Sequence, residues 1–96
     1  MKRCEMLGVR LAEAVGGVAE TYPSSLSPDR TVAMIRGDGD LLAYGSAVGR
    51  ENAWRDCLEY VLASSSAAAW LPPGLIAATL EELELRLAVY GGRGGR

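Results

Sequence analysis

The dipeptide Asp38-Gly39 stands between two short apolar runs, and a helical pattern follows the second run at once. Both central residues of a type I′ turn need a positive φ, which Asp-Gly accepts, so the dipeptide predicts a two-residue β-hairpin turn. The chain from residue 31 to residue 63 therefore predicts an antiparallel hairpin that leads directly into a helix over 50–63.

Unbroken pairing outward from this turn sorts the hairpin side chains onto two faces. One face is expected to carry Ala33, Ile35, Leu42 and Tyr44, and the other Val32, Met34, Arg36, Leu41 and Ala43. Both faces are apolar, whereas a two-layer protein needs only one apolar sheet face. Either a helix or the C-terminal segment covers the second face, or Val32, Met34 and Leu41 form a docking surface.

The rest of the chain predicts an α+β fold. Apolar residues repeat at helical spacing from Cys4 to Val15, and Gly16-Gly17 is expected to end this first helix. Residues 18–22 are either a third, short strand, which we favour, or the last turn of that helix. Another helix begins near Pro73 and is expected to end at Gly91. We expect one domain over 1–90 and a disordered Gly/Arg tail over 91–96.

Composition argues against most catalytic classes. The 96 residues contain no histidine, so Ser–His and Cys–His nucleophiles and histidine-ligated metals are excluded. Both Gly-rich phosphate-binding motifs are missing as well. We expect a protein that is not an enzyme and that needs no cofactor or metal. The two cysteines, Cys4 and Cys57, fall on apolar helix faces, and two buried thiols are favoured over a disulfide. No apolar leader or membrane-length run is visible, so a cytoplasmic location is expected.

Candidate contact residues lie in two parts of the sequence. The first part is the hairpin and its turn, with Met34, Arg36, Asp38, Asp40 and Leu41. The second is the acidic start of the last helix, with Glu81, Glu82 and Glu84. Apolar and acidic side chains together suit a protein partner that carries a basic groove, and the formal charge of −2 fits such a partner better than a phosphate backbone.

The order helix, strand, strand, strand, helix resembles that of the double-stranded-RNA-binding domain. Within 45–58, Gly45, Ala53 and the pair Cys57-Leu58 match small residues of that family's motif. Arg50 stands where the motif has its first lysine, but Glu51 and Trp54 replace the other two. The resemblance covers about half of the chain and implies this fold. It also implies, as an alternative function, RNA binding through Arg50, Arg55, Arg93 and Arg96.

The same plan is also similar to that of small phage and prophage accessory proteins, some of which are anti-CRISPR proteins. The similarity concerns size, acidity and element order. It implies a non-enzymatic inhibitor or adaptor that occupies a surface of a host protein complex.

The last helix offers a further alternative. Ile76, Leu80, Leu83 and Leu87 repeat at steps of four, three and four, which is typical of an apolar seam. Packing into the protein's own core is favoured, because two heptads rarely suffice for a coiled coil. A homodimer through this seam is the alternative.

Overall fold

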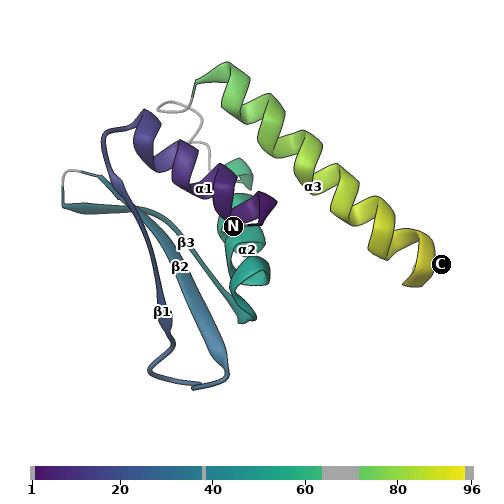
Figure 1. Ribbon diagram of the computed structural model, residues 1–96, viewed down its shortest axis with the longest axis horizontal. Helices are drawn as coiled ribbons and strands as arrows, with labels where there is room; N and C mark the ends of the chain where they lie inside the picture. Colours follow the sequence, from purple (N-terminus) through teal and green to yellow (C-terminus); the bar gives the residue numbers. More distant parts are fainter. Residues whose placement is uncertain (1, 38, 64–71, 95–96) are drawn as a thin grey trace.

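The computed structural model of the protein describes residues 2–37, 39–63 and 72–94, and the side chains up to residue 83 (Figure 1). The elements follow one another as α1 (Arg3–Ala14), β1 (Val18–Pro23), β2 (Arg30–Gly37), β3 (Asp40–Val48), α2 (Arg50–Ala63) and α3 (Pro73–Gly94). This α+β arrangement is the one predicted. The segment that the sequence left open between strand and helix is strand β1.

The three strands form one antiparallel sheet in the order β1-β2-β3. The hairpin closes as predicted, with Gly37 paired to Asp40 and Arg36 to Leu41, and Gly39 has a φ of 81°. A β-bulge follows at once, because Ile35 pairs with Ala43 and leaves Leu42 as an extra residue on β3.

The bulge corrects the predicted faces of the hairpin. Beyond Leu42 the pairing shifts by one residue, so Ala43 joins Ala33 and Ile35 in the core, and all three are buried. Tyr44 pairs with Met34 on the opposite face and is exposed. The prediction that placed Tyr44 inside and Ala43 outside was wrong, since one extra residue exchanges the faces of every residue after it.

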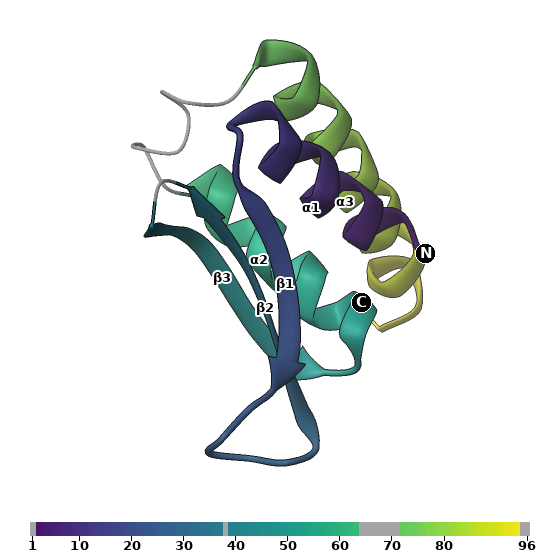
Figure 2. The same ribbon diagram turned by 60° about the vertical axis from the view of Figure 1, so that its left-hand side comes forward.

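Helices α1 and α2 cover one face of the sheet, and α3 lies beside α1 (Figures 1 and 2). The core lies between these layers and includes Leu11, Trp54 and Leu58. Two glycines allow the close packing. A Cβ on Gly8 would overlap the Trp54 ring, and a Cβ on Gly45 would overlap the backbone of α2 at Cys57. Trp54 is therefore a core residue, whereas Trp70 lies outside the described residues.

Helix α1 ends in a Schellman motif. Gly16 has a φ of 70°, its N–H donates to the carbonyl of Glu13, and the N–H of Gly17 donates to the carbonyl of Ala12. Strand β1 begins directly after this turn, at Val18. The helix thus ends at the Gly16-Gly17 pair, as predicted.

Helix α3 begins at Pro73 and continues to Gly94. The helix therefore extends three residues beyond the end predicted at Gly91. Residues 95–96 lie outside the described part of the chain.

Candidate protein-binding surface

The sheet face opposite α1 and α2 is not covered by any described segment (Figure 2). We call it the open sheet face. Strand pairing places eleven side chains on it: Val18, Glu20, Tyr22, Arg30, Val32, Met34, Arg36, Leu41, Tyr44, Ser46 and Val48. Several large apolar members are about half exposed, at 55% for Val18, 53% for Leu41 and 49% for Tyr44.

Met34 lies in the middle of the open sheet face, Tyr44 pairs with it on β3, and Tyr22 lies on β1 two residues beyond the position that pairs with Met34. The Tyr22 hydroxyl lies 3.3 Å from the Met34 sulfur, so the ring of Tyr22 leans over the central strand. Tyr44 pairs with Met34 from the other side, and its ring centroid lies 5.4 Å from that of Tyr60 on α2. Tyr22, Met34 and Tyr44 thus form a row across the three strands, and both rings remain about half exposed.

Charged side chains stand beside this row. Arg36 lies 3.8 Å from Glu20, and both side chains remain about half exposed. Arg30 donates to the Ser46 carbonyl at 2.8 Å and to the Ser46 hydroxyl at 3.3 Å. Both arginines are thereby oriented along the sheet and still reach solvent.

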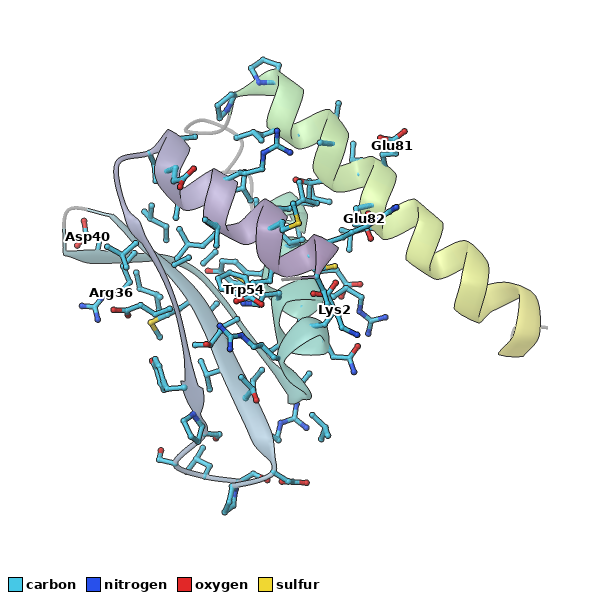
Figure 3. The ribbon with its side chains drawn as sticks, in the orientation of Figure 1. Lys2, Arg36, Asp40, Trp54, Glu81 and Glu82 are labelled. Carbon is cyan, nitrogen blue, oxygen red and sulfur yellow. The ribbon has the colours of Figure 1, made fainter. Side chains whose placement is uncertain are left out.

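The structure separates the predicted contact residues into two groups. Met34, Arg36 and Leu41 share the open sheet face, and Asp40 lies at its hairpin end. Glu81 and Glu82 lie on α3, away from that face, as Figure 3 shows. Asp38 and the side chain of Glu84 lie outside the described residues. Among the described acids, Asp40 and Glu81 therefore lie on different parts of the molecule.

Glu82 also has a structural role. Its carboxylate lies 3.5 Å from Arg3 of α1, and its side chain is only 11% exposed. Glu81, at the preceding position of α3, is exposed. Of these two acids, Glu81 is the accessible one, whereas Glu82 helps to hold α3 against α1.

Sequence reasoning did not select Tyr22, Arg30 or Tyr44. A signal for Tyr44 exists, because the three successive apolar residues Leu41-Leu42-Ala43 break the period of two and are typical of a bulge. Pairing of 18–23 with 31–36 would also have brought Tyr22 opposite Val32.

The arginines of the RNA-binding alternative are not gathered on one surface. Arg50 donates to a Glu5 carboxylate oxygen at 2.7 and 3.0 Å, so its charge is already balanced. Arg55 is half-buried on α2, and its Nε makes no hydrogen bond within the described residues. The side chain of Arg93 and the whole of Arg96 lie outside the description.

The apolar seam of the dimer alternative is divided between core and surface. Leu83 is 6% exposed in the core, and Ile76 packs against it, whereas Leu80 is 44% exposed. The side chain of Leu87 lies outside the description. Core packing, which the sequence favoured, is what the structure shows for Leu83.

A hollow of about 350 Å³ lies where the N-terminal ends of α1 and α2 meet. Its lining includes Glu5, Arg50 and Glu51. The Glu51 carboxylate accepts hydrogen bonds from the N–H groups of Cys4, at 2.8 Å, and Glu5, at 3.2 Å. Since Glu5 also binds Arg50, these groups join one helix to the other, and the hollow is built by contacts that stabilise the fold.

Cys57 and Asp29 each have a shifted pKa. Burial, and secondarily the Asp56 carboxylate, raises the pKa of the Cys57 thiol to about 12, so this thiol stays protonated and is a poor nucleophile. A hydrogen bond from the Ser27 hydroxyl lowers the pKa of exposed Asp29. Cys4 and Cys57 do not form a disulfide, and both are buried, as expected.

Across the described residues, no three His, Cys, Asp or Glu side chains gather where they could hold a metal ion. None of the helices in the described ranges has the length and apolar character needed to cross a membrane. Comparison with family models, curated proteins and solved structures finds no match.

Proposed function

We propose that the protein is a binding module that docks on another protein through the open sheet face. The observation that carries this proposal is the row of Tyr22, Met34 and Tyr44 on the uncovered side of the sheet. An ordinary two-layer protein leaves this side polar, whereas here it holds rings and a thioether flanked by Arg30 and Arg36.

The composition of this surface supports a protein partner. Tyrosine, methionine and arginine are enriched at the centres of protein interfaces, where a few aromatic and arginine side chains supply most of the binding free energy. Tyr22 and Met34 already restrain one another through a 3.3 Å contact. Binding therefore orders few additional side chains, which lowers its entropic cost.

A narrower form of the proposal is an inhibitor that blocks a surface of its partner, as anti-CRISPR proteins do. An acidic surface that mimics nucleic acid has little support, because Asp40 and Glu81 lie on different sides of the molecule. Occlusion by the apolar centre of the open sheet face is the version that the geometry favours.

The test compares two methionines that differ in position. The tagged 96-residue protein captures partners from a nuclease-treated lysate, with Met34→Asp and Met6→Asp as variants. Met34 lies on the open sheet face, whereas Met6 is 46% exposed on α1. We expect Met34→Asp to lower capture of a stoichiometric partner at least about tenfold and Met6→Asp to leave it unchanged.

Equal capture by both variants contradicts the proposed surface. Capture that nuclease abolishes contradicts a protein partner and favours the RNA-binding alternative, with Arg55→Glu as the next variant to measure.

A further inference from the structure

Strand β1 forms one edge of the sheet and pairs only with β2 among the described strands. The N–H of Ser24 donates to the carbonyl of Arg30 at 3.0 Å, and this bond continues the β1–β2 register. Backbone groups of an antiparallel strand alternate between its two edges. The N–H groups of Glu20 and Tyr22 therefore point toward β2.

By the same alternation, the backbone groups of Ala19, Thr21 and Pro23 point toward the outer edge of β1, away from β2. Pro23 has no N–H, and an outward position on an edge strand is where proline costs no ladder hydrogen bond. Ala19 and Thr21 keep both N–H and carbonyl groups. The outer edge thus presents two adjacent donor–acceptor pairs, the pattern that another strand can bind.

The opposite edge of the sheet, on β3, is blocked. The N–H of Ser46 donates to the Asp56 carboxylate of α2 at 2.9 Å, so a side chain already occupies this outward group. The bulge at Leu42 interrupts the regular spacing of the ladder, and Tyr44 packs against Tyr60 beside it. Such features prevent strand addition. On β1, Glu20 carries a charge and Pro23 lies at the end of the strand, but the pairing register with β2 is regular from Val18 to Pro23.

We propose that β1 accepts an extended segment of the partner protein as a fourth strand of the sheet. This inference rests on the proposed function and names the form in which the partner binds. Strand addition supplies main-chain hydrogen bonds along Ala19 and Thr21, and the same segment then borders the open sheet face beside Tyr22.

The geometry disfavours a second copy of β1 as the occupant. If β1 of a second copy pairs antiparallel with β1 of the first, two registers bring the outward backbone groups of the two strands opposite one another. One register sets Glu20 opposite Glu20 of the second copy in a close pair, where like charges destabilise the sheet. The other sets Pro23 opposite Ala19, and each end of the ladder then lacks one hydrogen bond.

Side chains on β1 define the chemistry of the segment. Val18, Glu20 and Tyr22 alternate along its solvent side. A basic residue across from Glu20 is favoured, because the 3.8 Å contact with Arg36 leaves the Glu20 carboxylate half exposed. Apolar residues two positions before and after that basic residue then lie beside Val18 and Tyr22. The fitting partner is a segment with an apolar-x-basic-x-apolar pattern.

The test uses the full chain and a displayed library of random nine-residue peptides as the probe. We expect enriched peptides to carry the apolar-x-basic-x-apolar pattern. Thr21→Pro removes an outward N–H that does not bond to β2. It should lower the affinity for an enriched peptide about tenfold or more. Thr21→Val keeps the N–H and should bind as the unmodified protein does.

Two further measurements keep the test decisive if Thr21→Pro unfolds. Methylation of the peptide nitrogens that face β1 should abolish binding to the unmodified protein, whereas methylation of the alternate nitrogens should not. Glu20→Lys should weaken binding of the peptide that carries the basic residue. A peptide with glutamate in place of that residue should bind the Glu20→Lys variant with the original affinity.

Failure to enrich any peptide, or equal binding by Thr21→Pro and Thr21→Val in folded protein, overturns strand addition. If Met34→Asp still prevents capture of a partner while Thr21→Pro does not, the open sheet face stands without a fourth strand. If neither variant affects capture, the proposed function itself fails.

Discussion

The ring of Trp54 lies directly against the backbone of Gly8, where α1 crosses α2. Trp54 is 1% exposed and is the largest fully buried side chain among the residues that the structure describes. Glycine at position 8 lets the two helices approach closely enough for the ring to fill the space between them. A side chain at this position has no room.

Gly8→Ala should therefore destabilise the protein. Alanine normally favours a helix interior over glycine by about 0.5–1 kcal/mol, but overpacking against Trp54 costs about 1–3 kcal/mol or more. We expect a net loss in the free energy of unfolding measured with urea. Gly74→Ala on α3, where an added Cβ meets nothing within 4 Å, is the control and should be neutral or stabilising. Equal effects of the two variants would contradict the close packing.

Glu51 supplies the N-terminal cap of α1 from another helix. Lys2, at the N-cap position, makes no side-chain capping bond, and the Glu51 carboxylate accepts from two N–H groups of the first turn instead. Glu51→Ala should lower the free energy of unfolding by about 1–2 kcal/mol, and Glu51→Gln by less, because one acceptor oxygen remains. Glu59→Ala, at an exposed position of the same helix, should change it by about 0.5 kcal/mol or less. The contact is not needed for stability if Glu51→Ala and Glu59→Ala unfold alike.

The contrast between Gly39 and Leu42 shows how far the sequence predicts this fold. The hairpin, α2 and the start of α3 follow from local signals: Asp38-Gly39, the apolar period of 50–63 and Pro73. The bulge at Leu42, which moves Tyr44 to the open sheet face, has no comparably specific local signal. Uninterrupted alternation therefore predicts Met34 and Leu41 correctly but misplaces Tyr44.

The contacts of Glu51 and Arg50 mark a second limit. Both bind residues about 45 positions away in α1, at separations of 46 and 45. Local pattern predicts that these charged residues begin a helix, but it carries no signal for a partner so distant in the chain. The sequence alone therefore allows Arg50 to bind phosphate, whereas in the structure Arg50 binds Glu5.

Substitutions of Leu83 and Leu80 distinguish packing of α3 into the core from formation of a dimer through α3. Leu83 is buried at 6% exposure, so Leu83→Ala should cost about 2–4 kcal/mol. Leu80 is 44% exposed, and Leu80→Ala should cost well under about 1 kcal/mol. Urea unfolding measured across a hundredfold range of protein concentration should give one midpoint for each variant. A midpoint that rises with concentration and that Leu80→Ala lowers would instead support the homodimer seam.

Cys57 should make stability fall at alkaline pH. Burial raises its pKa from 9.0 to about 12 in the folded protein, so above pH 9 the unfolded chain loses a proton that the folded protein retains. Its contribution to stability is complete below pH 9 and declines as the pH rises toward 12, by about 1.4 kcal/mol for each pH unit. Urea unfolding of the unmodified protein and of Cys57→Ala, measured at intervals from pH 8 to pH 10.5, isolates this slope. Other groups titrate equally in both proteins, and the cavity left by alanine shifts the whole curve without tilting it. The curve of Cys57→Ala should therefore be the flatter one above pH 9, and parallel curves would show that the folded protein does not retain this proton.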